Sequence, residues 1–187
     1  QGFATGNPDN DAWAIRHFAT RSAGTLEFAV AQSFSKNFGL YGERCGALHI
    51  VTRDQASAAN VEAVLKKISR AEITSTPGFG AKVIATIMKD EKLREQWYRD
   101  LQTMSGRLRD MRGRLLEGLI RRETPGNWGH LVTDIGMFSM TGLSQEQVVA
   151  LRERFHVYLL PTGRLSMTGL THDNVEYVAE SIDKVVR

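Results

Sequence analysis

The chain has 187 residues, of which 42% are hydrophobic, and this balance is typical of a globular protein that buries a sizeable core. The formal net charge is +3, and the basic residues between positions 94 and 122 alternate with acidic ones, which favours a solvated helix face over a nucleic-acid surface. No apolar run approaches the ~18 residues of a membrane span, and the five histidines lack metal-ligand spacing. We therefore expect no nucleic-acid partner, no membrane association and no metal ion.

The first half of the chain alternates between helical and strand-like segments. Asn10 and Asp11 are suited to cap a short helix, and the apolar segment that starts at Leu26 is typical of a strand buried on both faces, as in a parallel sheet. Apolar residues at near-helical spacing predict two further helices on either side of a Pro-Gly loop. We expect these elements at residues 10–18, 26–34, 46–52, 55–73 and 81–88.

A long helix comes next. Its apolar residues step by three or four throughout, which predicts one apolar stripe on a helix of seven or more turns. The stripe consists of Leu93, Trp97, Leu101, Met104, Leu108, Met111, Leu115 and Leu119. Such a stripe is more typical of core or interdomain packing than of a cofactor pocket. Pro125 and Gly126 end the helix.

Shorter elements fill the rest of the chain. Ser144 and Gln147 form a capping box that opens a helix, and a last helix is expected from Thr171. Strands are predicted at residues 135–140, 157–160 and 164–167. The pattern indicates an α/β class, with part of a larger α/β domain at residues 1–103 and a small α+β domain at residues 104–187 that is entered along the long helix. Two strands cannot form the large sheet of such an α/β domain, so we expect further polypeptide to complete it.

The most informative motif is SFSKNFGLYGER at residues 33–44. Lys36 follows an apolar strand, and a lysine held at a strand end can form an imine with an aldehyde. Hydroxyls at Ser33 and Ser35 and the guanidinium of Arg44 suit a phosphate dianion. The motif therefore predicts a site for a phosphorylated aldehyde.

With this motif, the chain resembles the aspartate aminotransferases, which are fold-type I enzymes that use pyridoxal 5′-phosphate. The resemblance covers almost all of the chain. It rests on QGF at 1–3, DAWAIRHF at 11–18, SFSKNFGLYGERCG at 33–46, GNWGHLVTDIGMFSMTG at 126–142 and VYLLPTGRLSMTGL at 157–170. In the family, an aspartate and a tyrosine of the cofactor site precede QGF, so the resemblance identifies the chain as a C-terminal half. It implies that residues 1–103 belong to a large domain with a mainly parallel sheet and helices.

The resemblance assigns the cofactor contacts. Lys36 would form a Schiff base with pyridoxal 5′-phosphate and would then carry the proton that leaves the substrate Cα, a suitable role for a tethered neutral amine. Ser33, Ser35 and Arg44 correspond to family residues that hold the cofactor phosphate. Gly39 is expected to serve the turn rather than the chemistry.

Three further residues are assigned to the substrate. Arg164 matches the family arginine that binds the α-carboxylate, and Phe138 matches an aromatic residue near the substrate, although it could equally be plain strand core. Arg70 lies 34 positions after Lys36, as does the family arginine that reaches in from the second subunit to bind the side-chain carboxylate. Residues 74–77 read TSTP where the family commonly has Ser-Asn-Pro-Pro, but the spacing from Arg70 to Gly80 is kept.

The resemblance thus implies a homodimeric transaminase that moves an amino group between L-aspartate and 2-oxoglutarate. An aromatic amino acid aminotransferase of the same subfamily is one alternative. A non-catalytic fragment that acts as a dimerisation or binding module is another, because the carboxylate that partners the cofactor ring nitrogen would lie in the missing half. The lone Cys45 agrees with a reducing compartment, and we expect the cytoplasm, with the mitochondrial matrix as the alternative.

Overall fold

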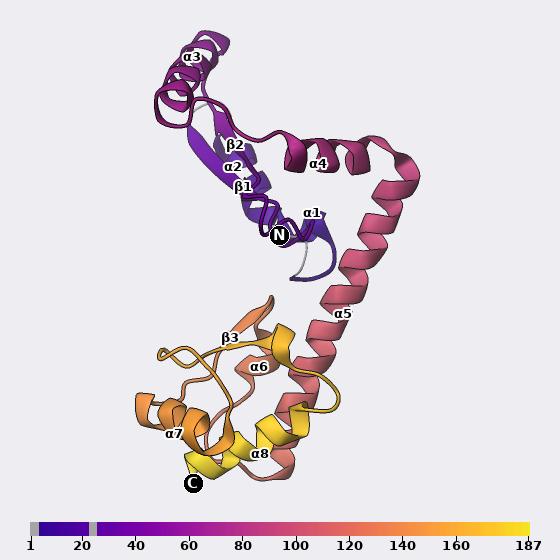
Figure 1. Ribbon diagram of the computed structural model, residues 1–187, viewed down its shortest axis with the longest axis vertical. Helices are drawn as coiled ribbons and strands as arrows, with labels where there is room; N and C mark the ends of the chain where they lie inside the picture. Colours follow the sequence, from indigo (N-terminus) through magenta and orange to yellow (C-terminus); the bar gives the residue numbers. More distant parts are fainter. Residues whose placement is uncertain (1–3, 23–25) are drawn as a thin grey trace. The chain divides into compact units, whose positions relative to one another are not determined.

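The computed structural model describes residues 4–22 and 26–187, so Gln1–Phe3, where the resemblance begins, lie outside the described residues. The described chain forms two compact units. Unit 1 contains Asn7–Leu101, and unit 2 contains Ala4–Gly6 and Gln102–Arg187. The long helix α5 (Glu91–Arg121) contributes its first turns to unit 1 and the remainder to unit 2 (Figure 1).

Unit 1 contains helices and one pair of strands. Its elements before α5 are α1 (Pro8–Asp11), α2 (Trp13–Ser22), β1 (Phe28–Ser33), β2 (Gly46–Val51), α3 (Gln55–Glu72) and α4 (Phe79–Lys89). The predicted helix at residues 55–73 is confirmed as α3. The predicted cap at Asn10 and Asp11 is wrong, because Asn7 is the capping residue. Its Oδ1 accepts from the backbone N–H groups of Asp9 and Asn10 at 2.9 and 3.2 Å.

The strand pair of unit 1 is antiparallel. Phe28 pairs with Val51 at one end and Ser33 with Gly46 at the other. Residues of β1 alternate between half-buried and exposed, so the predicted burial on both faces is not observed. One face of β1 is thus half-buried and the other is exposed, and β2 is its only partner strand among the described residues.

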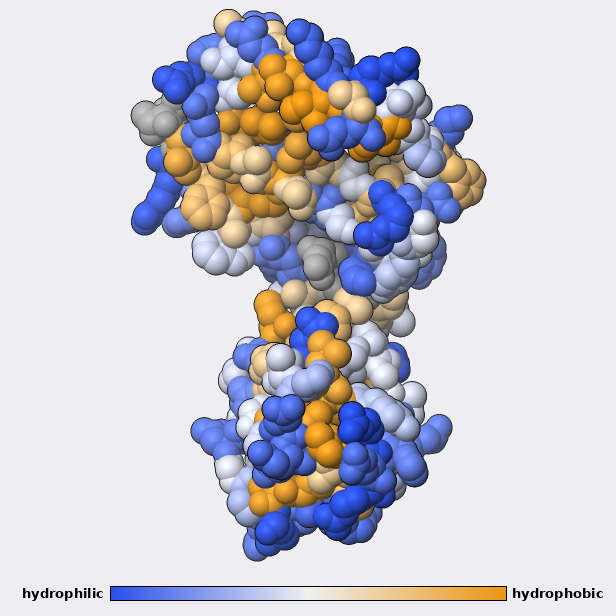
Figure 2. All heavy atoms as spheres, turned by 60° about the vertical axis from the view of Figure 1, so that its left-hand side comes forward, coloured by the Kyte–Doolittle hydropathy of each residue, from blue (hydrophilic) through white to orange (hydrophobic). Residues whose placement is uncertain are grey.

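Unit 1 exposes much apolar surface, and Figure 2 shows hydrophobic side chains gathered on this unit. The exposed apolar residues of β2 and α3 are Leu48, Ile50, Val51, Val64 and Ile68. Within the described residues, Leu101 is the only buried hydrophobic residue of unit 1, and it is the last residue of that unit. A two-stranded sheet with such a surface is not a complete sheet layer, as the sequence suggested.

Unit 2 holds most of the buried core. Its elements after α5 are α6 (His130–Thr133), β3 (Phe138–Met140), α7 (Gln145–Phe155), β4 (Arg164–Ser166), the short 3₁₀ helix η1 (Met167–Gly169) and α8 (Val175–Val186). From α5, Met111, Leu115 and Leu119 are fully buried, as are Leu151 of α7 and Ile182 of α8. The predicted apolar stripe is therefore core over the second half of α5, whereas Leu93 and Met104 remain more than a third exposed.

The small elements of unit 2 were predicted in part. The capping box at Ser144 and Gln147 is confirmed, and β3 and β4 pair antiparallel. The prediction of a strand at residues 157–160 is wrong, because within the described part of unit 2 only β3 and β4 pair as strands. The last helix begins at Val175 rather than Thr171, because the Thr171 N–H is bonded to Asn174 Oδ1 in a preceding turn.

Neither a membrane-spanning helix nor a metal cluster is found among the described residues. None of the described helices combines the length and apolarity that a membrane crossing needs. Likewise, no three His, Cys, Asp or Glu side chains of the described part gather as ligands of one ion.

Candidate active site

Lys36 lies on a tight turn that directly follows β1. The turn is closed by the Phe38 N–H, which donates to the Phe34 carbonyl at 3.3 Å, and it is tied to the start of β2 by the Phe34 N–H, which donates to the Cys45 carbonyl at 3.1 Å. Gly39 ends the turn with a φ of +66°, a backbone conformation that suits glycine. The expected role of Gly39 in the turn thus agrees with its geometry.

The turn is held against α5 by an aromatic contact. The Trp97 indole N–H donates to the Asn37 carbonyl at 2.7 Å, and the Trp97 ring stacks on Phe38 with centroids 5.0 Å apart. The two residues that follow Lys36 in the turn are therefore fixed by Trp97, which lies 61 positions after Lys36. Trp97 was predicted only as a member of the apolar stripe, because its contact with the turn is not local in sequence.

Lys36 is half-buried, and its ammonium lies over the ring of Tyr41, 4.0 Å from its centre. This is a cation–π contact, which is worth about 0.5–1 kcal/mol at exposed sites. Tyr41 was not among the predicted site residues. The signal that could have identified it is an aromatic side chain in the same short loop, five positions after the lysine.

The three predicted phosphate-binding residues lie together. Ser33, Ser35 and Arg44 line one hollow of about 220 Å³ beside the start of β2. The Ser33 hydroxyl lies 3.2 Å from that of Ser35 and accepts from the Ser35 N–H at 3.2 Å. Ser35 is buried, whereas Arg44 is exposed. Two hydroxyls and a guanidinium at one small hollow form a donor set that suits an anion.

The backbone of Arg44 is strained. Its φ is +50°, in the left-handed region that costs a non-glycine residue roughly 1–2 kcal/mol. Its Nη1 donates to the Tyr41 carbonyl at 3.0 Å, which orients the guanidinium. Strain of this kind is concentrated at functional sites, and here it occurs at a predicted cofactor contact.

In unit 2, Arg164 and Phe138 lie on neighbouring strands. Arg164 of β4 pairs with Met140 of β3, so Phe138 is its diagonal neighbour, and the guanidinium lies 4.4 Å from the centre of the Phe138 ring. Both line an open hollow of about 420 Å³, together with Thr133, Asp134, Ile135, Ser139 and Met140. The exposed guanidinium retains free donors that can bind a carboxylate.

Arg70 stands alone in the described chain. It lies in the last turn of α3 and is exposed, and no hydrogen bond or ion pair joins its side chain to another described residue. Among the described residues of unit 1, no such contact therefore joins Arg70 to the Lys36 turn. The spacing from Arg70 that supports its assignment leads to Gly80 of α4, where an added Cβ would lie 3.0 Å from the Cβ of Cys45. Gly80 thus allows α4 to approach the loop that contains Arg44.

The chain is similar to known proteins over its whole length. The family model described as "Aminotransferase class I and II" matches residues 1–182. The cytoplasmic aspartate aminotransferase of Saccharomyces cerevisiae is 44% identical over 191 residues, which is 100% of this chain and 46% of the relative. The chain thus spans about half the length of the curated relatives it matches.

Solved structures give the same result. A mitochondrial aspartate aminotransferase from Trypanosoma brucei has a TM-score of 0.95 and 41% identity and is covered to 48%, with all of this chain aligned. An aromatic-amino-acid aminotransferase from Burkholderia pseudomallei, covalently bound to pyridoxal phosphate, has a TM-score of 0.95 and 37% identity, with 100% of this chain and 46% of that chain covered. These similarities confirm the predicted α/β class and the family resemblance.

Proposed function

The chain belongs to the class I and II aminotransferases, and from this premise we propose that the complete protein is an aspartate aminotransferase. It would transfer an amino group reversibly between L-aspartate and 2-oxoglutarate, giving oxaloacetate and L-glutamate. The observation that supports this most directly is the 44% identity to the yeast cytoplasmic aspartate aminotransferase over all of this chain. The location of that relative supports a cytoplasmic protein, with the mitochondrial matrix as the alternative that the Trypanosoma brucei relative suggests.

We propose pyridoxal 5′-phosphate as the cofactor. The hollow lined by Ser33, Ser35 and Arg44 fits its phosphate, because hydroxyl donors and a guanidinium complement a dianion without an opposing carboxylate among the lining residues. The family relative from Burkholderia pseudomallei carries this group. When bound, the cofactor supplies an electron sink for the charge that develops at the substrate Cα.

Lys36 would supply the amine that bonds to the cofactor aldehyde. Once displaced by the substrate amine, Lys36 Nζ would take the proton from the substrate Cα and later return one, first as a general base and then as a general acid. The stacking of Trp97 on Phe38 supports this role, because a fixed turn holds the amine in one place.

Two arginines would recognise a dicarboxylate. Arg164 would bind the α-carboxylate with its planar fork, and the Phe138 ring at 4.4 Å restricts the orientation of that fork. Arg70 would bind the distal carboxylate in the neighbouring subunit, so the proposal includes a homodimer. The absence of a partner for Arg70 within the described chain is in keeping with a role outside its own unit.

The complete protein needs more polypeptide than this chain. The relatives are about twice as long, and the exposed apolar residues of β2 and α3 offer a surface that further polypeptide of the large domain would cover. We therefore assign the domains as the C-terminal part of the cofactor-binding large domain, residues 1–103, followed by the small domain, residues 104–187. An isolated, non-catalytic fragment remains the competing hypothesis.

A rival enzyme activity is transamination of aromatic amino acids. The similarity to the Burkholderia pseudomallei enzyme supports it, although at 37% identity against 44% for the yeast aspartate enzyme. The relative turnover of aspartate and phenylalanine separates the two. For an aspartate aminotransferase, we expect the turnover of aspartate to be clearly higher than that of phenylalanine.

Covalent trapping tests the proposed chemistry. The complete protein, loaded with pyridoxal 5′-phosphate, is reduced with borohydride, digested and mapped by mass spectrometry. We expect the label on Lys36, no label and no turnover in Lys36→Arg, and unchanged label and turnover in Lys184→Ala, whose exposed lysine pairs with Glu180 on α8. A label on another lysine, or none in the loaded protein, contradicts the proposal.

A further inference from the structure

Arg112 of α5 is a cation buried in the core of unit 2, with 2% of its surface exposed. Its Nη1 donates to the Leu131 carbonyl at 2.8 Å, and its Nη2 donates to the carbonyls of Gly136 and Phe138 at 3.0 and 2.6 Å. Among the described residues, no carboxylate lies within ion-pair distance of it. One buried guanidinium therefore binds three backbone carbonyls of a single segment, residues 131–138.

Stability alone does not account for this residue. Burial lowers the pKa of Arg112, an effect that the charge of Asp134 opposes, and Nε is buried without a hydrogen-bond partner. A buried charge without an ion-pair partner is commonly less stabilising than a well-packed apolar side chain. The effect of Arg112 therefore lies in the backbone segment that its guanidinium holds in place rather than in the stability that it adds.

The segment bound by Arg112 forms one wall of the hollow that contains Arg164. Asp134, Ile135 and Phe138 line that hollow, and Arg112 binds the carbonyl of Phe138 itself and that of Gly136, two positions before it. The Phe138 ring is in turn the surface on which the Arg164 guanidinium rests. A shift of the Phe138 backbone would thus move the contact that orients Arg164.

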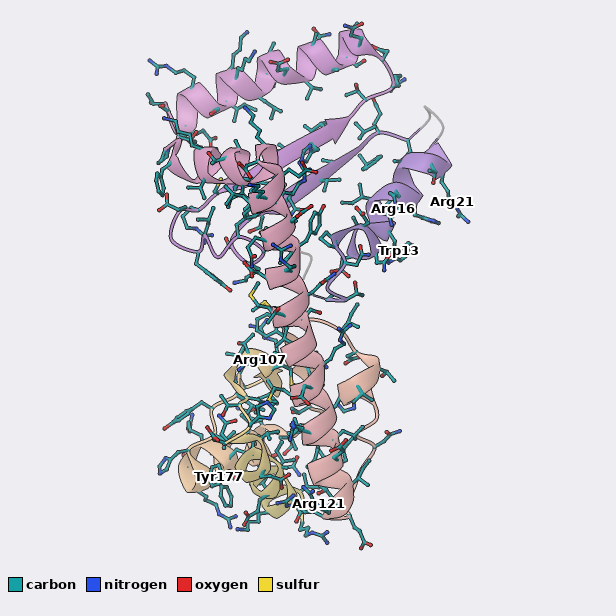
Figure 3. The ribbon with its side chains drawn as sticks, turned by 90° about the vertical axis from the view of Figure 1, so that its right-hand side faces the viewer. Trp13, Arg16, Arg21, Arg107, Arg121 and Tyr177 are labelled. Atoms are coloured by element: carbon teal, nitrogen blue, oxygen red, sulfur yellow. The ribbon has the colours of Figure 1, made fainter. Side chains whose placement is uncertain are left out.

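A second arginine of α5 holds the same end of the strand pair, where the start of β3 lies opposite the end of β4. Arg107 projects from the same helix (Figure 3), and its Nη2 donates to the carbonyls of Leu170 and Thr168 at 2.6 and 3.3 Å, just after β4. The strand pair that carries Phe138 and Arg164 is thereby fixed to α5 at this end through both of its strands. Of the two anchors, only Arg112 is buried and bound to the Phe138 backbone itself.

We propose that Arg112 is a positioning residue for carboxylate recognition: by binding the carbonyls of Leu131, Gly136 and Phe138, it fixes the Phe138 ring and so the orientation of Arg164. The inference rests on the proposed function, since it concerns the arginine assigned to the substrate α-carboxylate. Arg112 itself lies behind the wall of the hollow and does not line it.

The test uses the complete, cofactor-loaded protein with Arg112→Lys, Arg112→Ala and the matched control Arg114→Lys. Arg114 is an exposed arginine two positions later that pairs with Asp110. The readouts are kcat and KM for aspartate, the Kd of succinate as an unreactive dicarboxylate, and the thermal midpoint. A lysine ammonium cannot span three carbonyls as a fork does, so Arg112→Lys should raise KM and Kd about tenfold while kcat changes less than about threefold. Arg114→Lys should leave all of them unchanged within about twofold.

Chemical rescue adds a second readout. Arg112 lines a small hollow of about 180 Å³ on its own side of the wall, so added guanidinium ion should enter the space left in Arg112→Ala and lower KM and Kd towards the wild-type values. If Arg112→Ala fails to fold, Arg112→Lys decides the matter. A lower thermal midpoint with wild-type KM and Kd in Arg112→Lys would overturn this inference but leave the proposed function standing. A wild-type protein with no transamination would instead overturn the proposed function.

Discussion

The Arg164 guanidinium lies 4.4 Å from the centre of the Phe138 ring, on the diagonal of an antiparallel strand pair. Phe138→Leu would keep an apolar side chain but remove the π face. Since a cation–π contact at an exposed site is worth about 0.5–1 kcal/mol, we expect KM for aspartate to rise about 2–5-fold with little change in kcat. Steady-state kinetics of the complete protein measures this.

Phe155→Leu is the matched control for that substitution. Phe155 is the last residue of α7, and Arg154 lies 5.2 Å from its ring, but it does not line the hollow that contains Arg164. We expect its KM to equal that of the wild type. A change of KM in Phe155→Leu as large as in Phe138→Leu would show that the ring acts through general stability rather than through Arg164.

Arg44 should bind the phosphate of the cofactor rather than its ring. Arg44→Gln removes a charged donor, and because hydrogen bonds to charged groups contribute about 1.5–3 kcal/mol, the Kd for pyridoxal 5′-phosphate should rise about 10–100-fold. The Kd for pyridoxal, which lacks the phosphate, should not change. Absorbance titration gives both constants.

Arg53→Gln supplies the control in the same unit. Arg53 pairs with Glu27 at 3.0 Å on the exposed surface, and it does not line the hollow of Ser33 and Ser35. Its loss should leave both constants unchanged. An equal loss of affinity for pyridoxal and its phosphate in Arg44→Gln would remove Arg44 from the phosphate site.

Arg70 should determine the preference for a dicarboxylate. Replacing it with Gln would leave the distal carboxylate of aspartate without its cation, and an unpaired buried charge costs several kcal/mol. We expect kcat/KM for aspartate to fall at least about 100-fold, whereas that for phenylalanine stays within about threefold. Competition between the two substrates provides the measurement, and a parallel loss for both would contradict the assignment.

Features that depend on neighbours in the sequence were predicted well. The α3 helix and the capping box of α7 follow from apolar spacing and from Ser144 and Gln147, which act within one turn. The strand predicted at residues 157–160 failed because a strand requires a partner, and its apolar residues alone do not show whether one is present.

The site shows the same division. Ser33, Ser35 and Arg44 were predicted from one short motif, and they line one hollow. The anchors of the site, Trp97 and Arg112, could not be predicted in this way. Both lie on α5, where Trp97 donates to a backbone carbonyl 60 positions away and Arg112 donates to carbonyls 19 to 26 positions away. The sequence pattern of the helix identifies Trp97 only as apolar and Arg112 only as charged.

Glu176 should make stability depend on pH. Its carboxylate accepts hydrogen bonds from Arg121, labelled in Figure 3, and from Arg122, and these lower its pKa from the usual 4.5. A lowered pKa in the folded state means that the stabilisation is present above about pH 4.5 and is lost as the pH falls through the folded-state pKa. The difference in thermal midpoint between wild type and Glu176→Gln should therefore shrink from pH 7 towards pH 3.

A double-mutant background tests the cause. With Arg121→Gln and Arg122→Gln already in place, the carboxylate has lost both partners, so adding Glu176→Gln should change the midpoint equally at both pH values. A gap that still narrows with falling pH in this background would assign the effect to other groups around α8.

Gly118 should be required for the close packing of α5 on α8. A Cβ at this position would lie 2.8 Å from that of Ala179, which is fully buried and has no flexible end that could move aside. Gly118→Ala should therefore lower the free energy of unfolding by about 1–2 kcal/mol, since overpacking outweighs the gain of about 1 kcal/mol in helix propensity. Gly113→Ala, on the same helix, should instead raise it by about 0.5–1 kcal/mol, because beyond the helix backbone and the two chain neighbours no described atom lies within 4 Å of the added Cβ. Denaturant unfolding of the complete protein compares the two, and a Gly118→Ala protein as stable as Gly113→Ala would mean that the two helices are free to separate.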